Sequence, residues 1–163
     1  MVMKAVLRTD IGKVRSHNED YAGVFYNRAQ QLLAVVADGM GGHLAGDVAS
    51  RMTGTLLQKR WEETESILDQ EQAKQWFLEN LKSINHELFS YAMENPECTG
   101  MGTTVVAAIC LENFACIAHI GDSRCYIVTE DGILLLTEDH SLVNELVKTG
   151  QISEEDAEHH QFV

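Results

Sequence analysis

The sequence predicts an α+β fold with antiparallel strands, and three observations support this class. Segments with the apolar or alternating pattern of strands occur both before and after two long segments with helical periodicity. The stretch "TEDG" at 129–132 joins two strand-like segments in the manner of a tight hairpin turn. Strands and helices do not alternate regularly along the chain, so we do not expect a doubly wound parallel sheet.

The predicted strands are short segments bounded by polar residues or glycine. They lie at about 3–9, 21–26, 31–37, 103–111, 113–120, 124–129 and 133–137. The apolar run that closes the third of these segments leads directly into Asp38, which we expect to end a buried strand.

Two long helices are predicted between these strands. The first runs from Leu44 to about Trp61, and the second ends at Asn95, directly before the only proline. Apolar residues recur every three or four positions in each helix and should face the core. They are Leu44, Val48, Met52 and Leu56 in the first helix, and Phe77, Leu81, Ile84, Leu88 and Tyr91 in the second. A third, short helix is predicted at about 140–148, and "SEED" at 153–156 is typical of the start of a fourth.

Length and composition indicate one globular domain. The chain has 163 residues, of which 45% are hydrophobic, enough to bury roughly two thirds of its unfolded surface around one core. No linker, internal repeat or low-complexity segment divides it. We therefore expect residues 1–163 to belong to a single domain.

Cysteine usage and hydropathy indicate the cellular compartment. The four cysteines lack C-x-x-C spacing, so we expect free, mostly buried thiols in a reducing environment. The N-terminus lacks the pattern of a signal peptide, and the longest apolar run, 105–111, is too short to cross a membrane. The sequence therefore predicts a soluble, cytoplasmic protein.

The charge balance excludes several classes of partner. Twenty-five acidic residues stand against 12 basic ones, which gives a net charge of −13. Such a chain repels nucleic acid and anionic lipid, and no local basic cluster compensates. It can act on an anionic substrate only where metal ions or arginine reverse the sign of the local charge.

Acidic residues gather where the chain enters or leaves predicted strands. Asp20 and Asp38 flank two of these strands, and Asp122 lies between two others. Singly, such an aspartate is usually a turn or cap residue. Together with Glu19, however, they form the kind of oxygen-rich cluster that Mg²⁺ or Mn²⁺ requires at a sheet edge. Gly39 can turn its carbonyl towards an ion because it has no Cβ in the way.

Several segments, taken in order, resemble one enzyme family. They are "VRSHNED", "VADGMGG", "GMGTTVVAAIC", "AHIGDSRCYI" and "LTEDHSLVNELVKTGQIS". In order and spacing they resemble the bacterial branch of the metal-dependent (PPM, type 2C) serine/threonine protein phosphatases. The resemblance spans almost the whole chain and implies a four-layer α-β-β-α sandwich of two antiparallel sheets flanked by helices. It also implies a binuclear metal centre between the sheets.

The resemblance implies roles for the acidic residues and for Gly39. Asp38 matches the bridging metal ligand of the family, and Gly39 matches its backbone-carbonyl ligand. Glu19 and Asp20 match acids that hold the metals directly or through water. Asp122 matches an aspartate that helps to bind a third, looser ion in bacterial members. The implied cofactors are two Mn²⁺ or Mg²⁺ ions in the complete domain, with that third ion in addition.

Arg15 matches the arginine that binds the substrate phosphate in this family. Its planar guanidinium suits bidentate binding of a phosphate, whereas without its neighbours it would be taken for a surface residue. The resemblance implies that the substrates are phosphoserine and phosphothreonine in proteins. The chemistry suggests hydrolysis by a metal-bridged hydroxide, without a covalent intermediate. No serine or cysteine nucleophile is required.

The proton donor for the leaving alcohol is left open by the sequence. Many eukaryotic relatives carry a histidine directly after the Asp-Gly pair, but this chain has Met40 there, which cannot donate a proton. His43 is one candidate, although it fits better as a cap or packing residue at the start of a helix. Water on a metal is the preferred candidate.

The family pattern continues beyond this chain. Two further metal aspartates, one in an Asp-Gly pair and one in an Asp-Asn pair, are expected in the C-terminal third of the family and have no match here. Asp131-Gly132 is explained by a hairpin turn. We therefore expect a C-terminally incomplete catalytic domain, in which residues 140–163 form a flap-like segment beside the active site.

Two functions from different classes follow. The chain is a protein phosphatase acting on phosphoproteins, in bacteria commonly opposed to a Hanks-type kinase, or it is a catalytically inactive fragment or interaction module that keeps part of the fold. Missing strands would expose sheet edges and apolar surface, so we expect self-association through these edges.

Overall fold

The structure is a computed structural model that describes residues 3–42, 45–140, 149 and 153. It divides into two compact units, residues 1–119 and residues 120–163, which are described separately. Within the described residues, no helix combines the length and the apolar character needed to cross a membrane.

The first unit is built on an antiparallel sheet. Its strands are β1 (Asp20–Tyr26), β2 (Leu32–Met40), β3 (Gly102–Thr103), β4 (Val105–Cys110) and β5 (Ala115–Ile120). The strand order is β1-β2-β4-β5, and the short β3 extends the ladder at the end of β2. β2 is therefore a central strand, paired with β1 on one side and with β4 on the other.

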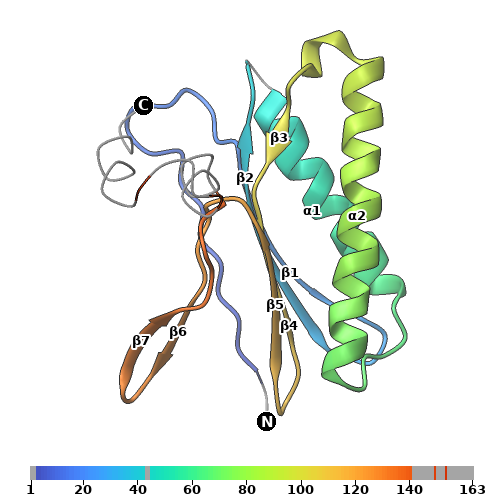
Figure 1. Cartoon of the computed structure of the whole chain (residues 1–163), viewed down its shortest axis with the longest axis vertical. Coiled ribbons are helices and arrows are strands. Elements are labelled where there is room, and N and C mark those ends of the chain that lie inside the picture. Colours follow the sequence, from blue (N-terminus) through green and yellow to red (C-terminus); the bar gives the residue numbers. More distant parts are fainter. Residues whose placement is uncertain (1–2, 43–44, 141–148, 150–152, 154–163) are drawn as a thin grey trace. The chain divides into compact units, whose positions relative to one another are not determined.

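Two helices cover one face of this sheet, as Figure 1 shows. They are α1 (Ala45–Glu63) and α2 (Gln70–Glu94), followed by a short 3-10 turn, η1 (Pro96–Cys98). Asp69 caps α2 by accepting a hydrogen bond from the Gln72 amide at 2.8 Å. Asn95 ends α2 directly before the proline, as the sequence predicts.

The core lies between the sheet and the helices. Side chains on alternate positions of β2 and β4 pack against apolar residues of α1 and α2. The largest fully buried side chain is Trp61, whose indole N–H donates to the Gln31 carbonyl at 3.1 Å. Trp76 packs edge-on against Trp61, with the ring centroids 5.0 Å apart.

The buried face of α1 differs from the predicted one. Ala49, Thr53, Leu57 and Trp61 are buried, whereas Met52 and Leu56 are only partly covered. In the first part of the helix this face carries small residues such as Ala49 and Thr53, which let it approach the sheet closely, and at its end Leu57 and Trp61 fill the core. The large apolar residues on which the prediction rested, such as Met52 and Leu56, lie at the edge of the buried face and not at its centre.

The strand predictions were mostly correct, with three differences. The segment 103–111 is not one strand but two, β3 and β4, which are separated at Thr104. β2 does not end at Asp38 but continues to Met40, because Gly39 and Met40 pair with Thr103 and Gly102. The segment 3–9 is not a strand, and it has no pairing partner among the described residues. An alternating apolar pattern alone does not make a strand, since the backbone groups need a neighbouring strand to bond to.

The second unit contains a hairpin of β6 (Tyr126–Thr129) and β7 (Gly132–Leu135). The turn falls on "TEDG", as predicted, and Gly132 adopts a φ of 139°, which suits glycine. Every residue of both strands is exposed. The helices predicted at about 140–148 and from 153, and nearly all of the flap-like segment 140–163, lie outside the described residues.

The predicted α+β class with two antiparallel sheets is confirmed by these elements.

Candidate functional site

The register between β1 and β2 brings two acidic residues together. Asp20 is paired directly with Asp38, at the end of the ladder where β1 begins. Both are exposed, and they lie on the face of the sheet opposite the helices, because the alternate residues Ala37 and Gly39 are buried. Like charges at directly paired positions repel each other, and a divalent cation between them would remove that repulsion.

Two threonines hold the backbone of Asp38. Its amide N–H donates to the Thr104 hydroxyl at 3.0 Å, and its carbonyl accepts from the Thr104 amide at 2.9 Å. The Thr103 hydroxyl also donates to this carbonyl, at 3.1 Å. Thr104 is almost fully buried, in the gap between β3 and β4. Asp38 therefore projects from a fixed point of the sheet.

Gly39 lies where β2 meets the beginning of α1. A Cβ at this position would lie 2.0 Å from the Gly46 carbonyl oxygen and 2.8 Å from that of Glu19. The Gly39 amide donates to the Glu19 carbonyl at 3.1 Å, which ties Glu19 to β2. No residue other than glycine fits here without displacing backbone.

A cavity of about 240 Å³ opens beside these residues. Its lining contains five of the predicted site residues, namely Arg15, Glu19, Asp20, Asp38 and Gly39, together with Asp10, Ile11, His17 and Asn18. Arg15 is exposed and forms no ion pair with another described residue. The structure thus brings together every predicted site residue of the first unit.

The N-terminal wall of the cavity is an irregular segment held by local hydrogen bonds. The Asn18 side-chain amide donates to the Thr9 hydroxyl at 2.7 Å, and the Asn18 side-chain oxygen accepts from the Asp20 amide at 3.0 Å. Asp10 accepts from the Gly12 amide at 2.7 Å. Sequence analysis missed Asp10, His17 and Asn18, although two of them lie between Arg15 and Glu19 and could have been found from that position.

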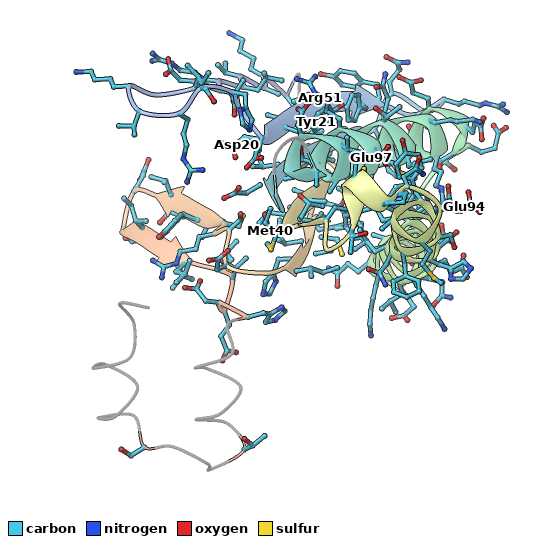
Figure 2. All side chains as sticks on the ribbon, turned by 90° about the horizontal axis from the view of Figure 1, so that it is seen from above. Asp20, Tyr21, Met40, Arg51, Glu94 and Glu97 are labelled. Atoms are coloured by element: carbon cyan, nitrogen blue, oxygen red, sulfur yellow. The ribbon has the colours of Figure 1, made fainter. Side chains whose placement is uncertain are left out.

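The side chain of Tyr21, which follows Asp20 in β1, packs against α1. The Tyr21 ring lies over Gly54, where a Cβ would come within 2.0 Å of it. Burial raises the pKa of the Tyr21 hydroxyl, and the nearby Arg51 opposes this in part. Figure 2 shows Tyr21 and Arg51 close together, next to Asp20. Arg51 also forms an ion pair with Asp47 in the first turn of α1.

Asp122 belongs to the second unit, in the segment between β5 and β6, and is exposed. Close to it in sequence, Arg124 donates from Nε and from one terminal nitrogen to the two carboxylate oxygens of Asp139, at 3.0 and 2.7 Å. These hydrogen bonds, and one to Tyr126, raise the pKa of the Arg124 guanidinium. The role of Asp122 in metal binding stays a prediction.

The donor atoms fit a hard divalent cation in their chemistry, since carboxylate and carbonyl oxygens are the ligands that Mg²⁺ and Mn²⁺ prefer. Within residues 3–42, 45–140, 149 and 153, however, no group of three or more His, Cys, Asp or Glu side chains is arranged to hold a metal ion. The described acids therefore line the cavity without closing around one ion.

Fold and site together define an α+β protein with a cavity that is lined by carboxylates and by one arginine. A comparison with protein families matches residues 12–162 to the model described as protein phosphatase 2C. The chain therefore belongs to the protein phosphatase 2C family.

Named relatives and solved structures agree with this family. The chain is 49% identical over 158 residues to the serine/threonine phosphatase stp of Listeria innocua, covering 97% of this chain and 63% of that protein. It is similar to the crystal structure of Stp1 from Staphylococcus aureus, with a TM-score of 0.84, 47% identity, and coverage of 94% and 60%. It also resembles the catalytic domain of the phosphatase PstP in complex with two manganese ions, with a TM-score of 0.72, 31% identity, and coverage of 92% and 61%. The chain thus spans about three fifths of the length of these relatives.

Proposed function

We propose that this chain is the larger part of a catalytic domain that hydrolyses phosphoserine and phosphothreonine in proteins, with the help of divalent metal ions. The observation that carries the proposal is the cavity in which the paired carboxylates of Asp20 and Asp38 meet Arg15. Membership of the protein phosphatase 2C family, and relatives named as serine/threonine phosphatases, support it.

Asp38, Asp20, Glu19 and the carbonyl of Gly39 are the proposed metal-holding groups, with Asp122 as a further ligand for a third ion. Either Mn²⁺ or Mg²⁺ suits these oxygen donors, and the manganese-bound relative favours Mn²⁺ as the first ion to test. Bound ions of this kind supply a nucleophile at neutral pH and neutralise charge that develops on phosphate oxygens.

The chain's own residues have separate tasks in this proposal. Arg15 binds two phosphate oxygens and orients the ester, since a guanidinium matches phosphate in a bidentate way. Asp20 and Asp38 supply negative charge at the floor of the cavity, and the threonine contacts keep Asp38 in place. Met40 cannot donate a proton to the leaving alcohol. Another residue or a water molecule therefore has to supply this proton.

The biological setting follows from the same proposal. The substrates are phosphoproteins, and a Hanks-type kinase is the proposed opposing enzyme. The four cysteines are free, which fits a reducing compartment such as the cytoplasm. Residues 1–163 form one incomplete domain in this proposal, with 140–163 as its flap, and self-association occurs through exposed sheet edges.

A second candidate is an inactive fragment or an interaction module. It is favoured by one observation, namely that the described acids do not close around an ion. The chain's coverage of only 63% of the Listeria phosphatase is consistent with it.

Hydrolysis of p-nitrophenyl phosphate and of a phosphothreonine peptide, with and without Mn²⁺, separates the two. Under the phosphatase proposal the complete domain turns over both esters only with Mn²⁺, and the 163-residue chain alone retains at most weak turnover. In the complete domain Asp38→Asn abolishes turnover because a ligand loses its charge. Turnover that Asp38→Asn leaves unchanged would contradict the site assignment. Absence of any Mn²⁺-dependent turnover by the folded complete domain would favour the inactive module.

A further inference from the structure

The side chain of Glu19 is held more tightly than its place before an edge strand suggests. Only 18% of it is exposed, although Asp20, next along the chain, is exposed. Its backbone carbonyl accepts from the Gly39 amide at 3.1 Å, which fixes where the side chain leaves the main chain. Two further residues contact the carboxylate itself.

The first of these residues is His17. Its Nε2 lies 3.3 Å from the Glu19 Oε1, and its Nδ1 lies 3.0 Å from the Ser16 hydroxyl. When that hydroxyl donates to Nδ1, a neutral imidazole carries its proton on Nε2 and donates it to Glu19. His17 also lines the cavity, together with Glu19 and Arg15.

The second residue is Gly46, in the first turn of α1. A Cβ added there would lie 2.9 Å from the Glu19 carboxylate carbon and 2.9 Å from the Gly39 carbonyl carbon. Real Cβ atoms essentially never come this close to another atom, so an alanine at 46 displaces either the carboxylate or the backbone of β2. The missing side chain at 46 therefore leaves room for Glu19.

We propose that His17 and Gly46 are positioning residues that hold the Glu19 carboxylate in the metal-binding cavity, His17 by a hydrogen bond and Gly46 by leaving the space it occupies. This inference rests on the proposed function, in which Glu19 is a metal-holding group. Partners that orient a metal-holding group typically matter about 10- to 100-fold in metal affinity.

The test is a calorimetric Mn²⁺ titration of the 163-residue chain and its variants, with the thermal midpoint measured without metal. We expect Gly46→Ala and His17→Ala to weaken Mn²⁺ binding by about 10- to 100-fold. His17→Gln restores part of the affinity, because its amide can still donate to Glu19. Two matched controls keep the affinity of the unaltered chain: Gly42→Ala, where a Cβ meets nothing within 4 Å, and His86→Ala, on the exposed side of α2.

Asp38→Asn separates this inference from the proposed function. If Asp38→Asn weakens binding while Gly46→Ala and His17→Ala bind like the unaltered chain, the positioning roles are wrong and the metal site stands. If the unaltered chain binds Mn²⁺ no better than Asp38→Asn, the proposed metal site itself is wrong. His17 is exposed, so its substitution costs little packing. The comparison of His17→Ala with His17→Gln therefore tests the positioning role even if Gly46→Ala fails to fold.

Discussion

From Val35 onwards, the side chains of strand β2 that point towards the helices are buried, and those on the opposite face are open to solvent. Earlier on that opposite face, Leu32 is buried and Ala34 is half-buried. Leu33, Val35 and Ala37 belong to the first group, whereas Val36 and Asp38 belong to the second. The two faces differ in chemistry as well as in exposure, because the helix face is apolar and the open face carries the carboxylate of Asp38. A single strand therefore separates the residues that stabilise the fold from those available for binding.

Truncation on the helix face should have the largest effect. We expect Leu33→Ala, at a fully buried position, to lower the free energy of unfolding by about 2–5 kcal/mol, because it leaves a cavity in the core. Val36→Ala on the open face, where 49% of the residue is exposed, should cost less than about 1 kcal/mol. Urea unfolding followed by tryptophan fluorescence measures both, and equal losses would contradict the distinction between the faces.

The next prediction concerns the hydrogen bonds by which the threonines hold the backbone of Asp38. Thr104→Val removes the hydroxyl that accepts from the Asp38 amide, and we expect a loss of about 1–3 kcal/mol in unfolding free energy. Thr104→Ser keeps the hydroxyl and should recover most of this loss. A valine variant as stable as the serine variant would show that the contact does not hold Asp38.

On the open face, Arg15 should affect substrate handling rather than stability. Arg15→Ala removes charge-assisted hydrogen bonds to phosphate, so we expect KM for p-nitrophenyl phosphate to rise about tenfold or more, with a smaller fall in kcat. Arg15→Lys keeps the positive charge but loses the planar guanidinium that binds two oxygens at once. Its KM should therefore lie between those of the unaltered chain and of Arg15→Ala. Unchanged kinetics in both variants would make Arg15 an ordinary surface residue.

The smallest effect is expected for the repulsion between paired carboxylates. Without divalent ions, Asp20→Asn should raise the free energy of unfolding by about 0.2–1 kcal/mol, because it removes a like charge facing Asp38. Salt screens such a repulsion, so the gain should shrink at 1 M NaCl. Paired urea titrations at low and high salt measure it, and a loss of stability would mean that Asp20 makes a favourable contact instead.

Local patterns in the sequence were sufficient for most of the fold. The helix before Pro96 and the "TEDG" hairpin were predicted because caps and turns depend on a few adjacent residues. The absent strand at 3–9 and the extension of β2 to Met40 were not, since both depend on which distant segment supplies a partner. The buried face of α1 was misplaced because close approach favours small residues, which carry little hydrophobic signal.

For the candidate site, the sequence identified the acidic residues at strand ends but not the residues that hold them in place. The pairing of Asp20 with Asp38 follows from a register that no local pattern reveals. Thr104 contacts Asp38 across a long stretch of sequence, and His17 resembles any surface histidine until its neighbours are placed. Contacts between residues distant in the sequence thus account for most of what was missed.

The connections of β2 also bear on how the chain folds. β1 and β2 form a hairpin through a short turn, whereas β4 joins β2 only after all of α1 and α2 has intervened. Contacts close in sequence form fast, while closing a long loop costs more entropy and slows pairing. We therefore expect the pairing of Asp20 with Asp38 to form earlier than the contact from Thr104, which requires closure of the longer loop. On this account, the geometry around Asp38 becomes fixed only in the later of the two steps.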